Sequence, residues 1–204
     1  MTMRIAIIAN TSGALYRFRR PLFEALLNEG FEVFAFHGGG DKYENYTQLL
    51  SEMGVAVREI SGLSSNSVKG LINQARQLHK ELKRLNIQRV HSFTHKANIA
   101  SYLATNRLRH IDLILNLTGL GALYTSNTNY VNKIKKNLLN IVYIGACARA
   151  RLIFFQNIED YYLFKELGLV SEDKARFTNG SGLDPTHFQP SETKTKLRVR
   201  ISEE

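Results

Sequence analysis

The sequence predicts an α/β fold, a Rossmann-like doubly wound parallel sheet. Short continuous apolar runs recur along the chain, such as RIAIIAN at residues 4–10 and DLILNL at 112–117, and strands buried on both faces have this pattern. Between them lie stretches in which apolar residues recur at steps of three and four, as in helices with one apolar face. Strands that alternate with helices in this way pair in parallel through crossover connections.

The first unit is a strand, a loop and a helix. RIAIIAN is the strand, and TSGALYRF at residues 11–18 is a loop with one glycine. Pro21 is tolerated in a first helical turn and opens the helix, which Gly30 ends. A second strand, FEVFAFH at 31–37, follows and is broken by the glycines at 38–40.

The next elements continue the alternation. We expect a helix at 46–53, a short strand from Val55, a long helix capped by Ser67, a strand from Arg89 and a helix at 97–108. The apolar stripe of the long helix consists of Val68, Leu71, Ile72, Ala75, Leu78, Leu82 and Leu85.

The remaining elements complete one domain. DLILNL and RLIFF at 151–155 are strands, and a long helix lies between them at 130–148. Asn157 caps a last helix, IEDYYLFKELG. After Pro190 the sequence becomes a charged tail with little capacity to form a core.

The composition limits the partners and the compartment. The chain has 204 residues and a net charge of +9, which attracts nucleic acid, acidic lipid headgroups or phosphorylated substrates, although a solvated basic surface explains the charge equally well. Cys147 is the single cysteine, which excludes an internal disulfide and favours a buried thiol. No apolar run approaches the roughly 18–20 residues of a membrane span, and no leader peptide is recognised, so we expect a cytoplasmic protein.

Five loops are candidates for the functional site. In an open parallel sheet, ligands bind beyond the carboxyl ends of the strands, where loops diverge and helix N-termini point outward. The loops at such ends are Thr11 to Phe18, His37 to Lys42, His91 to Lys96, Thr118 to Ser126, and Asn179 to Asp184. We expect them to converge on one cleft.

The residue types in these loops narrow the chemistry. The first loop has only Gly13 and fails the dinucleotide fingerprint, which disfavours NAD. His91, His95 and Lys96 could orient a hydroxyl, move a proton or neutralise a phosphate, whereas His91 within a strand is more typical of a satisfied packing residue. A zinc site has no third ligand at suitable spacing.

Two glycines, Gly119 and Gly121, follow Thr118 after a strand. They suit a backbone that passes close to a ligand, although a plain turn has the same sequence. No G-x-S-x-G elbow, H-E-x-x-H helix or Walker loop is present, which excludes serine hydrolases, zincins and P-loop NTPases.

Four segments in series resemble glycosyltransferase family 4, in the subgroup that builds bacterial surface polysaccharides and glycans on lipid carriers. They are RIAIIANTSGALYRFRRPLFEALLNEGFEV, HKANIASYLA, NLTGLGALYTS, and FQNIEDYYLFKELGL with NGSGLDPTHFQP. The resemblance covers nearly all of residues 4–190. It implies the N-terminal, acceptor-side half of an enzyme with two facing Rossmann-like domains, residues 1–178 forming that half and 179–204 the start of the interdomain linker and a charged tail.

The resemblance also implies roles for individual residues. Donor phosphates lie near the first loop, at Ser12, Gly13 and Ala14. The residues on the acceptor or sugar side are His95, Lys96, Asn98, Thr118, Gly119 and Gly121, and those on the linker side are Gly180, Ser181 and Gly182. Thr118 stands where many family members have a histidine, and a threonine is no base near neutral pH.

The donor-binding half, with the family's paired glutamates, lies outside these residues. The expected function is therefore the acceptor-binding half of a retaining glycosyltransferase, inactive or weakly active alone, with a nucleotide diphosphate sugar as co-substrate and a glycan or lipid-linked saccharide as acceptor. No metal, no further cofactor and no catalytic residue is assigned. The alternative is a non-catalytic binding or scaffold subunit that pairs with a separate donor-binding chain.

The basic residues raise the question of two further partners, a membrane and a nucleic acid. The helix around Lys133 to Lys136 is basic and carries Val131, Ile134, Leu138 and Val142 on its other side. It could bring the protein to the anionic inner face of the cell membrane, while packing of that apolar side on the sheet is the competing interpretation. A nucleic-acid partner is not expected, because the basic residues form no recognition pattern.

Overall fold

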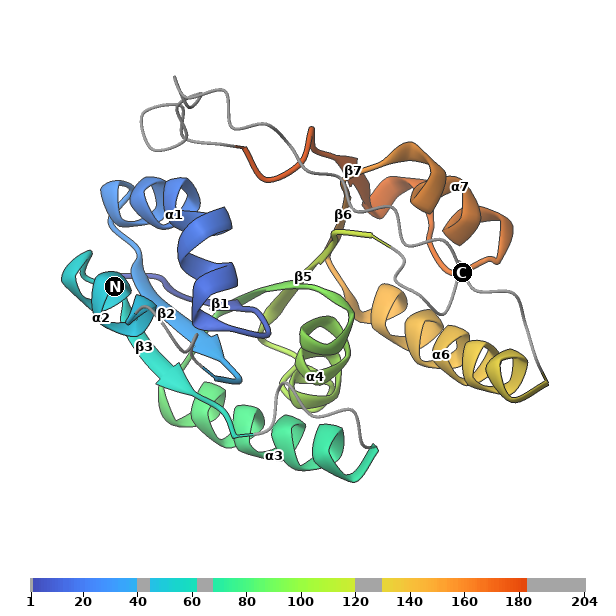
Figure 1. Ribbon diagram of the computed structural model, residues 1–204, viewed down its shortest axis with the longest axis horizontal. Coiled ribbons are helices and arrows are strands. Elements are labelled where there is room, and N and C mark those ends of the chain that lie inside the picture. Colours follow the sequence, from blue (N-terminus) through green and yellow to red (C-terminus); the bar gives the residue numbers. More distant parts are fainter. Residues whose placement is uncertain (1, 40–44, 62–67, 120–129, 183–204) are drawn as a thin grey trace, which may run out of the picture.

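The computed structural model describes residues 2–39, 45–61, 68–119 and 130–182, with side chains of 130–136 excepted (Figure 1). Within these residues a seven-stranded sheet has the order β3-β2-β1-β4-β5-β6-β7, and every pair of neighbours is parallel. The fold class predicted from the sequence is confirmed. The strands are β1 (Arg4–Ile8), β2 (Glu32–His37), β3 (Ala56–Glu59), β4 (Arg89–Phe93), β5 (Asp112–Leu117), β6 (Leu152–Phe155) and β7 (Ala175–Phe177).

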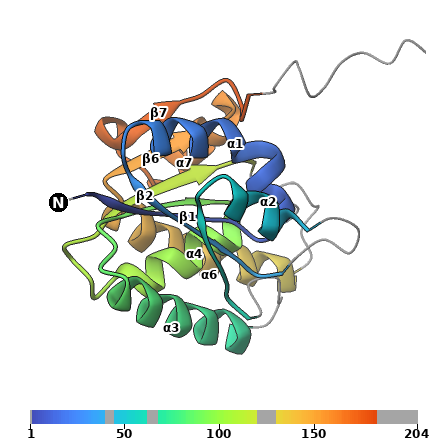
Figure 2. The ribbon, with the colours of Figure 1, turned by 90° about the vertical axis from the view of Figure 1, so that its left-hand side faces the viewer.

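Helices cover both faces of the sheet (Figures 1 and 2). Alternate residues of β1 explain this arrangement, because Ile5 and Ile7 pack with α1 and α2 whereas Ala6 and Ile8 belong to the core formed with α3, α4 and α6. Both faces of the strand are thus apolar, as a strand between two helical layers requires. The helices are α1 (Ser12–Asn28), α2 (Tyr46–Glu52), α3 (Val68–Arg84), α4 (His95–Thr105), α6 (Tyr130–Arg149) and α7 (Ile158–Glu166).

The start of α1 corrects one prediction. The helix begins at Ser12 and contains Pro21, so residues 12–18 are helical and not a loop. The side chain of Thr11 accepts a hydrogen bond from the Ala14 N–H at 3.1 Å, which caps the helix ahead of the proline. Pro21 interrupts one hydrogen bond inside a helix that packing on the sheet maintains.

Other boundaries differ less. α4 begins at His95 and ends at Thr105, two residues earlier at its start and three at its end than expected. Asn157 caps α7 by accepting from the Asp160 N–H at 2.8 Å, which confirms that prediction. The stripe on α3 is correct from Ala75 onward, but Val68 and Ile72 are exposed. Ser67, its expected cap, lies outside the described residues.

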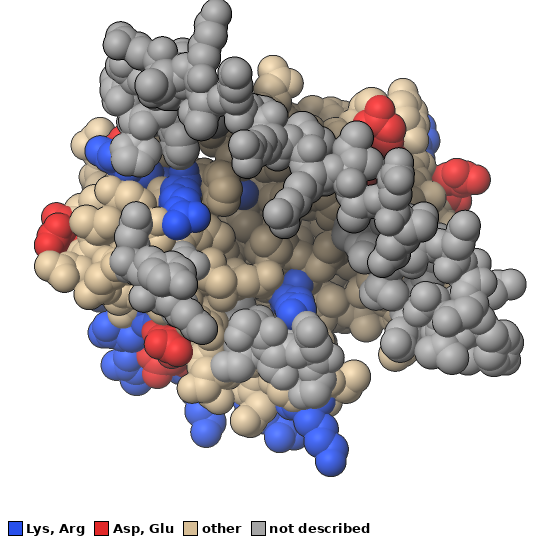
Figure 3. Space-filling view, viewed as in Figure 1, with Lys and Arg blue, Asp and Glu red and all other residues tan. Residues whose placement is uncertain are grey.

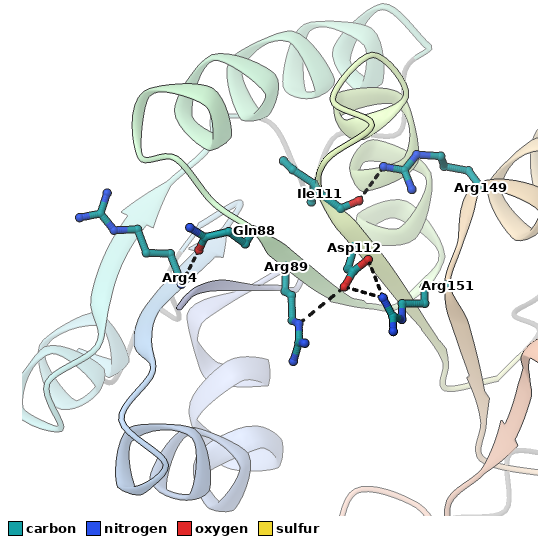
Figure 4. Close-up of polar contacts among 7 residues, drawn as sticks. All are labelled: Arg4, Gln88, Arg89, Ile111, Asp112, Arg149 and Arg151. Atoms are coloured by element: carbon teal, nitrogen blue, oxygen red, sulfur yellow. Dashed lines mark hydrogen bonds and ion pairs between the residues drawn. The ribbon is translucent and has the colours of Figure 1, made fainter. Parts of the chain in front are cut away.

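Charged side chains join the strands at their starting edge (Figure 4). The carboxylate of Asp112 on β5 lies 3.7 Å from Arg89 on β4 and 3.1 Å from Arg151 beside β6. Arg149 donates to the carbonyl oxygens of Leu108 and Ile111 at 3.1 and 2.7 Å. The arginines at this edge therefore have acceptors supplied by the fold.

Candidate functional site

A pocket of about 240 Å³ lies at the opposite, carboxyl edge of the sheet. Its walls come from the ends of β1, β4, β5 and β6, from α1, and from the segment after β7; the lining residues are Ala9, Ala14, Phe18, Arg19, Phe93, Thr94, Thr118, Gln156 and Ser181. The face of the molecule seen in Figure 1 is hollowed near its centre, with Lys or Arg atoms at the border (Figure 3). Four of the five candidate loops contribute a lining residue, so their predicted convergence is confirmed for those four.

Arg19 is the main charged group of this pocket. Its side chain is 92% buried, and its guanidinium lies 4.0 Å from the centre of the Phe93 ring. One terminal nitrogen donates to the Phe18 carbonyl oxygen at 3.2 Å and to the hydroxyl oxygen of Ser181. Burial lowers the pKa of Arg19 to about 10, so the group remains a cation near neutral pH.

Ser181 joins three parts of the pocket. Its hydroxyl oxygen accepts from Arg19 on α1 and from the side-chain amide of Gln156, which follows β6, at 3.3 Å. The flanking glycines Gly180 and Gly182 have φ of +82° and +73°, values that glycine adopts without strain. The segment predicted as the linker side thus lies against the strand ends.

Thr94 lies in the pocket wall with a strained backbone. Its φ is +79° and its ψ is 155°, an uncommon conformation for a β-branched residue. Its hydroxyl donates to the side-chain oxygen of Asn10 at 2.9 Å, which ties the end of β4 to the end of β1. Backbone strain of this kind clusters at ligand-binding and active sites, where the surrounding structure holds the residue in place.

His91 lies on β4, two residues before Phe93, and is not among the residues that line the pocket. Its ring lies 4.3 Å from that of Phe93 and 5.8 Å from that of Phe154. Burial, with the positive charge of Arg19 as a second cause, lowers the pKa of His91 to about 3. The ring is therefore neutral near pH 7, and its buried Nε2 has no hydrogen-bond partner in the described part of the chain. His91 is a packing residue, as expected, but it is not satisfied.

His95 and Lys96 begin α4. The Nδ1 atom of His95 lies 2.6 Å from the hydroxyl of Tyr143, a fully buried residue of α6. This contact directs the imidazole toward the junction of α4 and α6. Lys96 is half-buried. Neither residue is among those that line the pocket beside Arg19.

Asn98 is fully buried within α4. Its side-chain oxygen accepts from the Ser92 hydroxyl at 2.7 Å, and its amide donates to the Asn116 carbonyl at 3.0 Å. The side chain therefore joins β4 to β5 near their carboxyl ends.

The predicted donor-phosphate residues form the first turn of α1. The Ser12 N–H donates to the Gly39 carbonyl at 3.1 Å, and the Ala14 N–H is used by Thr11. The Gly13 N–H has no hydrogen-bond partner within residues 2–39 or the other described ranges. Helix N-termini with a spare N–H group attract anions. Of these three residues, Ala14 lines the pocket.

The second glycine-rich loop is only partly described. Thr118 lines the pocket, and Gly119 has a φ of +145°, a region that favours glycine. Gly121 lies outside the described residues. His37, at the start of the second candidate loop, is buried and accepts at Nδ1 from the Gly39 N–H at 3.2 Å, and burial lowers its pKa.

Sequence reasoning missed Arg19, Phe93 and Gln156. Arg19 lies between the predicted loop at 11–18 and the helix predicted to open at Pro21, and no role was predicted for it, yet it falls on the buried stripe of α1 with Ser12, Leu15 and Phe23. The sequence contains this three- and four-residue spacing of buried positions. The spacing can be recognised only if the helix begins at Ser12, after the cap at Thr11, and not at Pro21.

The chain resembles one curated enzyme over most of its length. It is 29% identical over 190 residues, 92% of the chain, to N,N'-diacetylbacillosaminyl-diphospho-undecaprenol α-1,3-N-acetylgalactosaminyltransferase of Campylobacter jejuni. The chain is glycosyltransferase-like. It spans about half, 49%, of the length of that transferase. No family model matches the glycosyltransferase-like chain.

Solved structures share the fold. A glycosyltransferase from Rickettsia africae superposes with a TM-score of 0.60 at 17% identity, covering 86% of this chain and 42% of that one. A UDP-N-acetylglucosamine 2-epimerase from Listeria monocytogenes, named putative, gives 0.60 at 14% identity, with 86% and 44% covered. In each case the matched part is a little less than half of the solved protein. The glycosyltransferase-like chain thus shares the fold of that part.

A helix that crosses a bilayer needs roughly 20 predominantly apolar residues. Across the described ranges, no helix of the glycosyltransferase-like chain is both long and apolar enough to cross a membrane.

Proposed function

We propose that the chain is the acceptor-side half of a retaining glycosyltransferase of family 4, which transfers a sugar from a nucleotide diphosphate sugar to a lipid-linked saccharide. The observation that carries this proposal is the pocket at the carboxyl edge of a sheet whose sequence is similar, over 92% of the chain, to a transferase named for a diphospho-undecaprenol substrate. Ligands of open parallel sheets bind at this edge.

The pocket offers groups that bind and orient a substrate. Thr94, Thr118 and Gln156 supply hydroxyl and amide groups, and Arg19 supplies a cation, whereas the Ser181 hydroxyl already accepts from Arg19 and Gln156. These are the groups needed to hold a saccharide hydroxyl and a charged diphosphate in place.

Among the described residues, the pocket lining contains no group suited to take the proton of an acceptor hydroxyl. No aspartate or glutamate of the described ranges is a lining residue. His91 is a weak base in its buried position, because its pKa is lowered to about 3. A second domain facing this edge would supply the missing charge stabilisation for the leaving diphosphate. We propose that the chain is inactive or weakly active alone for this reason.

The acceptor is proposed to be membrane-anchored, and α6 is the element suited to reach the membrane. Leu138, Ile141 and Ile144 are 58%, 65% and 51% exposed, so this side of the helix does not pack on the sheet. The buried side is formed by Tyr143, Ala146 and Cys147 instead. The basic segment at 133–136 precedes the exposed apolar side, although its side chains lie outside the described residues.

Pocket filling tests acceptor binding. Equilibrium dialysis with a labelled short-chain prenyl-diphosphate saccharide in detergent should give saturable binding to the chain without any sugar nucleotide. Ala14→Phe places a ring in the pocket and should weaken that binding by roughly 10-fold or more, since an overfilled pocket excludes its ligand. Ala25→Phe, at an exposed position on the same helix α1, is the matched control. Equal binding by the unmodified chain and Ala14→Phe would refute the acceptor pocket.

A further inference from the structure

The arginine side chains of this fold differ in how their charge is balanced. At the starting edge of the sheet, Arg4 lies 2.6 Å from Glu32. Arg89 and Arg151 share Asp112 (Figure 4). On the surface of α1, Arg20 lies 2.8 Å from Glu24. Each of these cations has a carboxylate that belongs to the fold.

Arg19 has none among the described residues. No carboxylate of the described ranges forms an ion pair with it, and the neighbours found there are an aromatic ring, a carbonyl and a hydroxyl. Only 8% of the residue is exposed. Burial of a cation without a counter-charge lowers the stability of the empty fold. A group held at such a cost is typical of sites where a ligand supplies the opposite charge.

The geometry leaves donors available on one side of the guanidinium. An arginine has five N–H donors in a planar fork. One terminal nitrogen donates to the Phe18 carbonyl and the Ser181 hydroxyl. The position of the guanidinium over the Phe93 ring limits its rotation. The Nε atom and the other terminal nitrogen have no hydrogen-bond partner in the described chain. Two such N–H groups match two oxygens of a phosphate.

The size of the pocket selects a small group. At about 240 Å³ it is below the roughly 300–1,000 Å³ of pockets that enclose whole drug-sized ligands. It therefore fits one charged part of a larger substrate. Thr94, Thr118 and Gln156 add polar groups around that part.

We propose that Arg19 binds a phosphoryl group of a diphosphate ester in this pocket. The inference rests on the proposed function, because glycosyl transfer from a nucleotide sugar to a lipid-linked acceptor provides two such esters. One is the nucleoside diphosphate of the donor, and the other is the diphosphate of the acceptor. Both present the same doubly anionic chemistry to the guanidinium.

Calorimetric titration of the chain with inorganic pyrophosphate tests the site directly. The unmodified chain should bind pyrophosphate with an affinity that falls as salt rises, and its thermal midpoint should increase with ligand. Arg19→Met keeps an apolar stem against Phe93 and removes the fork, and it should weaken binding by roughly 10-fold or more. Absence of pyrophosphate binding to the unmodified chain would overturn the proposal even if no variant folds.

Three variants separate ligand binding from a structural role. Arg20→Met removes a neighbouring arginine of α1 and should change the affinity less than about twofold. Ser181→Ala removes the hydrogen bond to Arg19 but keeps the cation, so it should retain most of the binding. Arg19→Lys should give intermediate affinity, because the charge remains without the fork. If Ser181→Ala weakens binding as much as Arg19→Met, Arg19 only holds the segment after β7 in place and the proposal is wrong.

Two competitors distinguish the source of the diphosphate. Uridine diphosphate represents the nucleoside diphosphate of the donor, and geranyl diphosphate represents the lipid diphosphate of the acceptor. Uridine and geraniol, which lack the phosphates, are the controls. Displacement of pyrophosphate by either diphosphate supports the site and identifies its source. Displacement by uridine or geraniol would overturn the proposal, since it would show recognition without phosphate.

The proposed function can fail separately. If pyrophosphate binds through Arg19 but no sugar is transferred by a longer polypeptide that joins this chain to a donor-binding domain, the anion site stands and the transferase proposal falls. If the longer polypeptide transfers sugar equally well with Arg19→Met, the transferase proposal stands and the role of Arg19 is wrong.

Discussion

His91 shows how one buried side chain makes the fold sensitive to pH. Its folded-state pKa of about 3 lies below the ordinary value of 6.5. The unfolded chain therefore binds a proton at His91 as pH falls through about 6.5, while the folded chain does not until near pH 3. Stability from the neutral imidazole is fully present above pH 6.5 and is lost progressively below it.

The size of this effect can be measured by urea unfolding at pH 7 and pH 5. Over that interval, His91 should lower the free energy of unfolding by about 2 kcal/mol, because each pH unit below the unfolded pKa contributes about 1.4 kcal/mol. His91→Gln should remove this part of the pH dependence. His110→Gln changes an exposed histidine and should leave it intact. If the free energy of unfolding falls equally between pH 7 and pH 5 in His91→Gln and in the unmodified chain, the assignment of this pH dependence to His91 is wrong.

At the scale of elements, α1 shows which sequence signals decide a helix. The sequence predicts that the first helical turn contains Pro21, since proline is common in that position. In the structure the cap at Thr11 starts the helix and the proline is tolerated inside it. The consequence reaches the site, because residues 12–19 then form two turns that bring Ala14 and Arg19 to the same pocket.

The exposed apolar side of α6 makes a testable prediction about membrane contact. The double variant Ile141→Asn, Ile144→Asn should reduce sedimentation of the chain with phosphatidylglycerol-rich vesicles by roughly 10-fold or more, since each isoleucine loses its burial in lipid. The unfolding free energy should change little, because both side chains are more than half exposed, at 65% and 51%.

A matched pair on another helix provides the control. Val68 and Ile72 on α3 are 68% and 42% exposed, and the variant with asparagine at both positions should sediment like the unmodified chain. If this control loses vesicle binding and the α6 variant does not, the membrane faces α3 and the assignment of α6 is wrong. No binding to any anionic vesicle would remove the membrane contact altogether.

For the whole molecule, the fold was more accessible from sequence than the site. The apolar runs located six strands, and alternation with helices predicted their parallel pairing. The short strand β7, ARF, escaped because only Ala175 in it is buried. Local patterns predicted where the carboxyl edge lies. The sequence did not reveal which side chains face the pocket, since that depends on where α1 begins and on the contacts of Ser181 with Arg19 and Gln156.

The histidines illustrate the same limit. His91 and His95 are four residues apart in the sequence, and both were candidates for proton transfer. The fold gives them different surroundings, with His91 beside a buried cation and His95 against the hydroxyl of Tyr143. Only the three-dimensional neighbours distinguish these environments.

An assay of sugar transfer tests most directly whether the chain is the acceptor-side half of a glycosyltransferase. The DNA that encodes the chain would be expressed together with the sequence beyond the codon for Glu204, and the product incubated with a panel of labelled sugar nucleotides and a prenyl-diphosphate saccharide. We expect an in-frame or adjacent donor-binding domain with paired glutamates, and a product that transfers the sugar with retained anomeric configuration. The 204-residue chain alone should transfer sugar at less than roughly one-hundredth of the rate of that product. No transfer from any sugar nucleotide by a product that contains such a domain would contradict this expectation.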